Sequence, residues 1–310
     1  MRFRLRDFVE TVDGWFFSVV GYENSPKIKG FLRYIPDEGG DRINRFRKGR
    51  FRKLSSDEAI EYIRKNKPEY DFSGIHFIPH GDVVYHYRPD RMLYRAMVRN
   101  KKLRKVVKFF LPEIPFEDMG ISGSMLIGME KDTSDIDFVV YGKSWFVARE
   151  KLRRSMGEGI KEPDELIWKT IYEKRKPALS FEEFLIHERR KYMRGVIDGT
   201  YFDLLYVRKA GNHPVREKKG KVLGVSKIIA RIVDDSFAFD YPSFYRVEHE
   251  EMSGILSFTH TFAGQAFKGE LVEAKGKVEI IDGRKYLVIG STREARDEYM
   301  KSLTLLEGKT

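Results

Sequence analysis

The chain has 310 residues, enough for two or three domains with sizeable cores. Its 58 Lys and Arg outnumber 47 Asp and Glu, and the net charge of +11 favours a polyanionic partner, although basic charge also serves solubility. The absence of cysteine excludes disulfides and thiolate metal sites. No apolar run is long enough to cross a bilayer, and the first residues are basic, so we expect no membrane span and a cytoplasmic location. A single Gln and five Asn are typical of a heat-loving source.

Residues 1–88 are predicted to form a β-rich N-terminal accessory domain. Apolar, β-branched and aromatic residues predict strands over 15–20 and 28–35, on either side of an Asn-Ser-Pro turn. A helix is predicted from Ser55 to about Lys65, because Ser55 and Glu58 form the pattern of a capping box and Pro68 follows.

Between these elements, residues 42–53 carry seven Lys and Arg with two interleaved phenylalanines, Phe46 and Phe51. Such a segment can bind phosphates through its cations and stack bases on its rings. A solvated, mobile loop explains the same composition.

A second region, residues 89–208, begins with a predicted long helix from about Asp90 to Phe110. Apolar residues follow one side of it and lysines lie largely elsewhere, as in an amphipathic helix. Pro112 ends the helix.

Gly123 and Ser124 then precede an apolar strand that carries Asp135 and Asp137. Alternation along the strand sends both carboxylates to one face, where their repulsion is relieved by a divalent cation such as Mg²⁺. Gly123 and Ser124 are expected to begin a short helix whose N–H groups attract phosphate. Phosphate and metal would therefore meet here. Gly-Ser pairs are common, however, and Asp-x-Asp pairs also occur in solvated turns and Ca²⁺ loops.

A helical insertion follows, with helices predicted over 144–156, 162–174 and 180–194, the last with a second Ser and Glu capping box. The apolar strand predicted over 201–207 carries one charged residue, Asp203. An isolated Asp on such a strand indicates an ion pair or a metal ligand.

Residues 209–310 are predicted to form a β-rich C-terminal domain, a barrel or small sheet with a terminal helix. Strands are predicted over 221–233, 254–262 and 267–274, followed by a hairpin whose Asp282-Gly283 turn favours the type I′ geometry. This hairpin and the one around Asp13-Gly14 have similar sequences, either because the two are related or by chance.

The Gly-Ser pair, the ten-residue spacer, the Asp-x-Asp pair and the later strand Asp together resemble the nucleotidyltransferase superfamily of DNA polymerase beta. The resemblance covers about residues 113–208 and is to nucleotidyltransferases of an archaeal, uncharacterised type. It implies an α+β fold, with a mixed sheet and flanking helices between the two β-rich accessory domains. It adds Gly128 and Ser134 to the matched pattern.

The resemblance implies that Asp135, Asp137 and Asp203 are both the catalytic residues and the ligands of Mg²⁺ or Mn²⁺. Gly123, Ser124 and Ser134 would then bind the nucleoside triphosphate.

The chain departs from the pattern at Met125 and Ile127, near which many members of the superfamily carry arginine. Arg190 and Arg194, from the last predicted helix of the insertion, are expected to replace those arginines on the triphosphate. The alternative is a solvent-facing basic helix that pairs with its own glutamates.

These features predict a metal-dependent transferase that moves a nucleoside monophosphate to an acceptor hydroxyl, with RNA favoured as the acceptor because of the basic charge. Protein and small-molecule acceptors stay open, since relatives with this core use them. A nucleic-acid-binding protein with little or no transfer activity is the other alternative. The sequence does not decide the oligomeric state.

Overall fold

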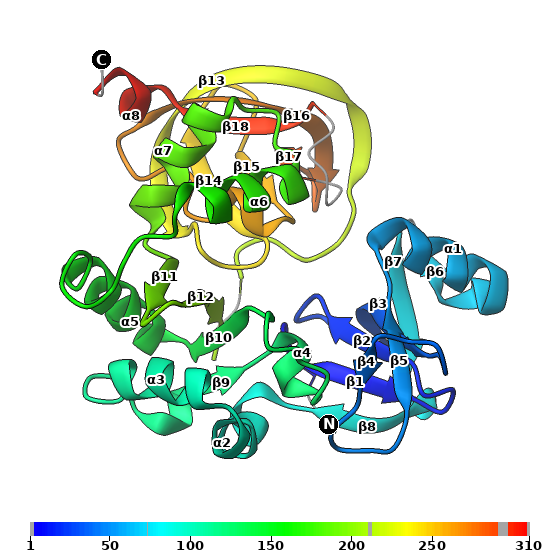
Figure 1. Ribbon diagram of the computed structural model, residues 1–310. Helices are drawn as coiled ribbons and strands as arrows, with labels where there is room; N and C mark the ends of the chain where they lie inside the picture. The colour runs from blue at the N-terminus through cyan, green and yellow to red at the C-terminus, as the bar shows by residue number, and fades with distance from the viewer. Residues whose placement is uncertain (1–2, 73, 210–212, 291–296, 309–310) are drawn as a thin grey trace. The chain divides into compact units, whose positions relative to one another are not determined.

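The computed structural model describes residues 3–72, 74–209, 213–290 and 297–308, which divide into two compact units. The first unit comprises residues up to 161 together with 194–209, and the second comprises 162–193 together with the rest of the chain. Both helices and sheets occur in each unit, which confirms the predicted α+β class (Figure 1). Among the described residues no helix has the length and apolarity required to cross a membrane.

The first unit begins with an antiparallel sheet of strand order β4-β5-β3-β2-β1-β8, with β7 also paired to β3 and β6 to β7. Helix α1 (Ser56–Asn66) has the predicted capping box and packs on one face through Ala59 and Ile63. The strands are β1 (Phe8–Thr11), β2 (Phe16–Val19), β3 (Lys27–Pro36), β4 (Arg42–Ile43), β5 (Arg50–Lys53), β6 (Asp71–Phe72), β7 (Ile75–Pro79) and β8 (Val83–Tyr87).

A mixed sheet completes the first unit, with the strand order β11-β12-β10-β9. Strand β10 (Ile136–Tyr141) runs parallel to β12 (Thr200–Val207), and β9 (Met119–Ile121) and β11 (Arg194–Ile197) pair antiparallel on the two sides. Helices α4 (Gly123–Leu126) and α5 (Lys143–Arg154) follow β9 and β10. The buried strands are almost continuously apolar, so Asp137 and Asp203 stand out as their half-buried polar residues.

The long helix predicted over 90–110 is wrong in one respect, because the chain breaks it at Asn100. Helix α2 (Pro89–Arg99) ends there, and α3 (Lys101–Phe110) begins at the next residue. Asn100 has extended backbone angles, and its side chain caps α3 by accepting from the amide of Leu103. Arg104 donates to the carbonyls of Met97 and Val98 and so closes the end of α2. The apolar periodicity continues across the break, which is why the sequence pattern conceals it.

The second unit combines a β-barrel with the two helices predicted as part of the core insertion, α6 (Glu165–Arg175) and α7 (Phe181–Lys191). Trp168 and Phe184 of these helices are buried in the same apolar cluster as the barrel strands. Pairings β13-β14, β14-β15, β15-β17, β17-β16 and β16-β13 close a ring. The strands are β13 (Lys221–Phe237), β14 (Ser243–Glu248), β15 (Gly254–Ser257), β16 (Leu271–Ile281), β17 (Arg284–Ile289) and β18 (Tyr299–Ser302), followed by α8 (Leu303–Glu307).

Two local features of the second unit test the sequence predictions. Asp282 and Gly283 both have positive φ, as the predicted type I′ turn requires. Helix α7 ends at Lys191 because Tyr192 takes a left-handed conformation, so Arg194 lies on strand β11 rather than on the predicted helix.

Candidate functional site

The carboxylates predicted from the sequence meet on two neighbouring strands of the mixed sheet. Asp137 on β10 and Asp203 on β12 are partners in the parallel register, so their side chains lie on one face at the spacing of adjacent strands, about 4.8 Å. Asp135 is exposed, lies directly before β10 and shares the alternation of Asp137. The structure therefore brings together the two strands that carry Asp137 and Asp203, with Asp135 directly before the first of them.

Gly123 is required by the position of Asp137. It has φ +64°, and a Cβ at this position would lie 2.0 Å from Asp137 Oδ2. The amide of Ser122 donates to the Asp137 carbonyl at 2.9 Å, which fixes the turn against the strand. Any side chain at Gly123 would displace the carboxylate, so the Gly-Ser motif and the Asp pair form one structural element.

Asp203 has a cationic partner on the adjoining strand. Arg194 pairs with it across β11 and β12, with Nε 2.9 Å from Oδ1, and the Tyr201 hydroxyl donates to the same oxygen at 3.0 Å. Arg194 is 3% exposed, so its charge is compensated inside the protein. Its guanidinium therefore orients Asp203, a contact that differs from the predicted role on a triphosphate.

Arg190, the other arginine expected on the triphosphate, lies in the second unit. Its guanidinium bonds to Glu270 at 2.6 and 2.9 Å and lies over the ring of Phe267 at 4.8 Å. Burial raises the pKa of Glu270, but the hydrogen bonds from Arg190 and Ser302 lower it by more. The pKa of Glu270 is therefore below its ordinary value. Arg190 thus stabilises the barrel unit through a charge-assisted pair.

The two serines of the motif differ in their surroundings. Ser134 accepts from the amide of Lys131 at 2.9 Å and closes the turn that leads into Asp135. Ser124 lies in α4, next to Gly123, and its carbonyl accepts from the amide of Met129. Ser124 is thus the serine placed beside the carboxylates, and Ser134 shapes the loop before them.

The apolar residues at the two departures from the family pattern have a structural reason. Ile127 is fully buried in an aromatic cluster that includes Phe16, Tyr34 and Tyr87 of the N-terminal sheet. Met125 is 3% exposed and contacts the amide of Asn100 through its sulfur. An arginine at Ile127 would lie inside this cluster without a counter-charge.

The basic segment 42–53 forms a short hairpin whose two phenylalanine rings are packed against the rest of the first unit. Its strands pair as a hairpin, and Arg45 donates its amide to the Gly128 carbonyl at 2.8 Å. Phe46 packs against Gly128 and is covered by the guanidinium of Arg95 at 4.0 Å, while Phe51 is buried. The segment is therefore docked on the loop of the Gly-Ser motif, with both rings used in packing.

This docking places further polar groups near the carboxylates. The pKa of Tyr34 is raised above its ordinary value, mainly because the side chain is buried. The positive charges of Arg33 and Arg42 lower this pKa, and the negative charge of Asp137 raises it. The charges of Arg42 and Asp137 therefore both influence the Tyr34 hydroxyl. Sequence reasoning missed Tyr34 and did not connect Arg42 of the basic segment with the carboxylates, since both residues come from a sheet that precedes the motif by almost a hundred residues.

The carboxylates of the site are the type of ligand that a hard cation prefers, but too few of the described ones are grouped to form a complete metal site. Carboxylate oxygens are the donors that Mg²⁺ and Mn²⁺ prefer, and Asp135 and Asp137 offer two from one strand end. Among the residues that the structure describes, no three His, Asp or Glu side chains are grouped closely enough to hold a metal ion. Asp203, the third predicted carboxylate, is engaged by Arg194.

Comparison with known proteins decides the family. The model of the nucleotidyltransferase domain matches residues 101–192, a range that includes Gly123, Ser124, Asp135 and Asp137. The "Uncharacterized protein MJ1086" of Methanocaldococcus jannaschii is 36% identical, in an alignment that covers 97% of this chain and 99% of that protein. The chain belongs to the nucleotidyltransferase family. No solved structure matches it.

The match to the nucleotidyltransferase domain has informative limits. It stops before Asp203, so the third strand carboxylate is placed by the structure rather than by the family model. It also includes α6 and α7, which the structure assigns to the second unit. The candidate site therefore combines residues of the matched segment with Asp203, which lies beyond it.

Proposed function

We propose that this protein transfers a nucleoside monophosphate from a nucleoside triphosphate to an acceptor hydroxyl, with Mg²⁺ or Mn²⁺ bound at Asp135 and Asp137. The observation that carries the proposal is the register of Asp137 and Asp203 on adjacent parallel strands, with Gly123 against the first of them. When bound, the ion neutralises phosphate charge and polarises the phosphorus that is attacked.

The protein groups have separate roles in this reaction. Ser124 and the backbone at Gly123 hold the phosphate chain beside the Asp pair. Asp203 accepts the proton of the acceptor hydroxyl, and Arg194 and Tyr201 orient it for this transfer. The acceptor oxygen forms a bond to the α-phosphorus, the bond from that phosphorus to the bridging oxygen breaks, and pyrophosphate leaves with the electron pair.

RNA is the proposed acceptor. The net charge of +11 favours a polyanion. In the barrel the first strand pairs with the second and fourth, and the third pairs parallel with the fifth. This is the strand order of OB-fold barrels, many of which bind oligonucleotides. The net charge and the strand order of the barrel support RNA as a class of acceptor, and the labelling experiment identifies the acceptor directly.

The test supplies each α-labelled nucleoside triphosphate with Mg²⁺ or Mn²⁺ to the protein, together with total RNA, DNA and protein from a matched extract. We expect label in the RNA fraction, and none with the Asp135→Ala/Asp137→Ala variant, whose fold is checked by circular dichroism. Equal labelling by the variant would reject the role of the carboxylates. Label in protein or small molecules would reject RNA as the acceptor but would leave the transferase activity supported. RNA binding with no label in any pool would favour a binding protein.

A further inference from the structure

The solvent face of helix α2 combines arginines with an aromatic ring. The inner face of the helix is buried through Met92, Leu93 and Ala96. On the other side, exposed residues at the spacing i, i+3, i+4, i+7 and i+8 form one stripe along the helix, and these are Arg91, Tyr94, Arg95, Val98 and Arg99. Tyr94 is 69% exposed and Val98 is 61% exposed. These five residues are called the α2 stripe below.

The positive charge of the α2 stripe is not compensated by carboxylates among the residues that the structure describes. The one acidic residue of the helix, Asp90, is partly buried and pairs with two arginines outside the stripe. Arg91, Arg95 and Arg99 are four residues apart, so their like charges repel one another. Helices α5 and α6 differ, because each pairs an exposed cation with a glutamate one turn away. A bound polyanion would relieve the repulsion in α2.

Two of the three guanidiniums are held in place without the use of their hydrogen-bond donors. Arg95 lies over the ring of Phe46 at 4.0 Å, and Arg99 lies over the same ring at 5.4 Å. Stacking on a ring orients a guanidinium and leaves its N–H groups available. Phosphate oxygens suit such groups, since they accept two parallel N–H bonds from one arginine. The hairpin that carries Phe46 thus prepares α2 for a phosphate backbone.

Tyr94 places an available aromatic ring among these cations. Its side chain makes no ring contact and no hydrogen bond with the described part of the chain. A base can stack on such a ring, and stacking tolerates any base because every base has a π-face. Cations interleaved with an exposed ring are typical of proteins that bind single-stranded nucleic acid. A duplex keeps its bases stacked on one another and would leave Tyr94 unused.

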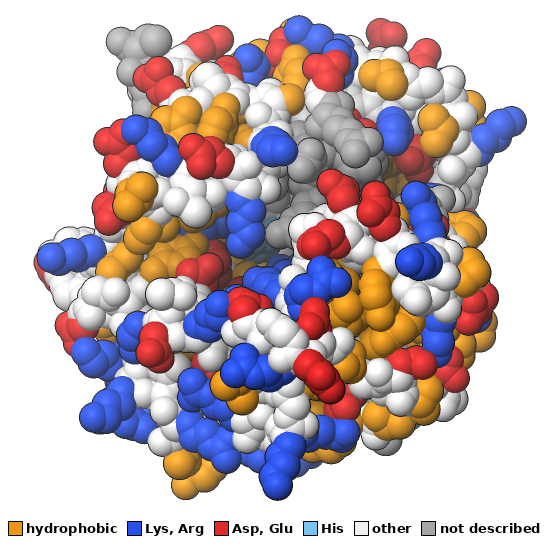
Figure 2. All heavy atoms as spheres, turned by 45° about the vertical axis from the view of Figure 1, so that its right-hand side comes forward, with side chains coloured by type: hydrophobic (Ala, Val, Ile, Leu, Met, Phe, Trp, Pro, Cys, Tyr) orange, Lys and Arg blue, Asp and Glu red, His pale blue; other side chains and the backbone are white. Residues whose placement is uncertain are grey.

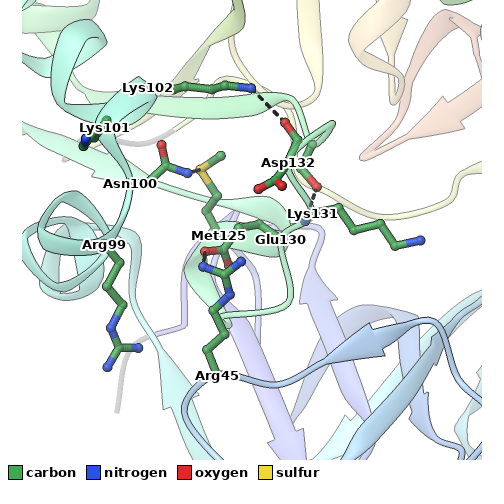
Figure 3. Close-up of a pocket in the computed structure, with 10 residues that line it drawn as sticks. Arg45, Arg99, Asn100, Lys101, Lys102, Met125, Glu130, Lys131 and Asp132 are labelled. Atoms are coloured by element: carbon green, nitrogen blue, oxygen red, sulfur yellow. Dashed lines mark hydrogen bonds and ion pairs between the residues drawn. The ribbon is translucent and has the colours of Figure 1, made fainter.

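The α2 stripe belongs to the same compact unit as the carboxylates. Met92, on the inner face of α2, is buried in one apolar cluster with Leu126 of α4. Arg99 ends the stripe and lines a cavity together with the loop 130–134, which leads into Asp135 (Figure 3). Figure 2 shows Lys and Arg side chains gathered over the lower part of the face in view, the level at which Figure 1 places α2 and α3. A strand bound along α2 is thus directed toward the site.

We propose that the α2 stripe binds the single-stranded RNA whose hydroxyl accepts the nucleotide, with its arginines on the phosphates and Tyr94 stacked on a base. The identity of the strand rests on the proposed transfer to RNA. Four residues of helix rise about 6 Å, so neighbouring arginines of the stripe contact different phosphates. Backbone contacts and stacking carry no sequence information, so the stripe holds RNA of any sequence.

The test measures the affinity of the full-length protein for a short single-stranded RNA by fluorescence anisotropy, at several salt concentrations and without nucleotide or divalent cations. We expect Tyr94→Ala to bind about tenfold more weakly with an unchanged salt dependence, because stacking involves no net charge. Arg91→Gln should bind about fivefold more weakly. Its slope of log affinity against log salt should become shallower by about 0.7, the contribution of one phosphate contact on a single strand.

Lys65→Gln is the matched control. It removes one exposed positive charge from helix α1 of the same unit and should bind RNA as the wild type does. Equal losses in Arg91→Gln and Lys65→Gln would mean that only the net charge matters, and would overturn the proposal. Full affinity of Tyr94→Ala would overturn it too. Binding to anionic phosphatidylserine vesicles but not to RNA would assign the stripe to a membrane surface and reject RNA.

The Asp135→Ala/Asp137→Ala variant separates this proposal from the transferase proposal, because it should bind RNA as the wild type does. If the wild type transfers no nucleotide but loses RNA affinity through Tyr94→Ala, the transferase proposal fails and the RNA-binding stripe stands. If transfer to RNA at limiting RNA concentration is unchanged in Tyr94→Ala and Arg91→Gln, the stripe is rejected and the transferase stands.

Discussion

The carboxylates and the cations of this site are encoded in different ways. Asp135 and Asp137 follow Gly123 within fifteen residues, and Asp203 joins them through one strand pairing. The Lys and Arg side chains around the loop of the Gly-Ser motif come from the hairpin at residues 42–53, the junction of α2 and α3 at residues 99–102 and the loop 130–134. A short local pattern thus specifies the acidic half, while the basic half exists only after distant segments have packed together.

The largest expected loss of activity comes from adding one methyl group to the acidic half. Gly123→Ala would place a Cβ 2.0 Å from Asp137 Oδ2, in a backbone conformation that disfavours Ala. We expect nucleotide transfer to fall by about 10²-fold, as for a catalytic group displaced by about 1 Å. Initial rates of label incorporation measure the loss.

Gly199→Ala is the matched control for this change. Gly199 has φ +73°, but a Cβ there would meet no atom within 4 Å. Its substitution imposes similar backbone strain without touching a carboxylate. If the two variants lost equal activity, strain alone would explain the loss and the contact with Asp137 would be irrelevant.

The second change tests whether the segment of the Gly-Ser motif tolerates an arginine of its own. Ile127→Arg introduces an arginine near a position where many members of the superfamily carry one, but Ile127 is fully buried among aromatic rings. We expect the free energy of unfolding, measured by denaturant titration, to fall by about 3 kcal/mol or more. Val98→Arg, at a position 61% exposed on α2, should leave it unchanged. A stable Ile127→Arg protein with improved nucleotide binding would show that the N-terminal sheet tolerates the motif arginine.

The smallest expected effect concerns the cation inside the acidic half. Arg194→Met removes the positive charge 2.9 Å from Asp203 and keeps an apolar stem to fill the space. We expect the affinity for Mn²⁺, titrated by electron paramagnetic resonance, to rise about tenfold because a competing cation is gone. The double variant Arg194→Met/Asp203→Asn should lose that gain. An unchanged affinity in the single variant would exclude Asp203 as a metal ligand.

Sequence reasoning succeeded where one strand or one turn determines the outcome. Asp137 and Asp203 stand out because each is an isolated charge on an apolar strand, and Ser55 with Glu58 predicts the start of α1 from four residues. It failed where partners are distant. The apolar face continues through Asn100, so periodicity predicts one helix where side-chain capping makes two.

The two arginines show the same limit. Arg190 and Arg194 are four residues apart, but Tyr192 ends the helix between them and sends the chain into β11. One guanidinium therefore pairs with Glu270 in the barrel unit and the other with Asp203 in the mixed sheet. Nothing in their sequence spacing indicates that the two residues belong to different compact units.

The chain passes from one unit to the other three times, after residues 161, 193 and 209. A ribosome therefore releases α6 and α7 before the strand that carries Asp203, and long before the barrel on which those helices pack. Until the barrel is synthesised, the apolar surface of these helices stays exposed. During this time the helices are open to aggregation and to binding by chaperones. No single proteolytic cut or truncation separates the two complete units. We therefore expect related proteins to contain both units or neither.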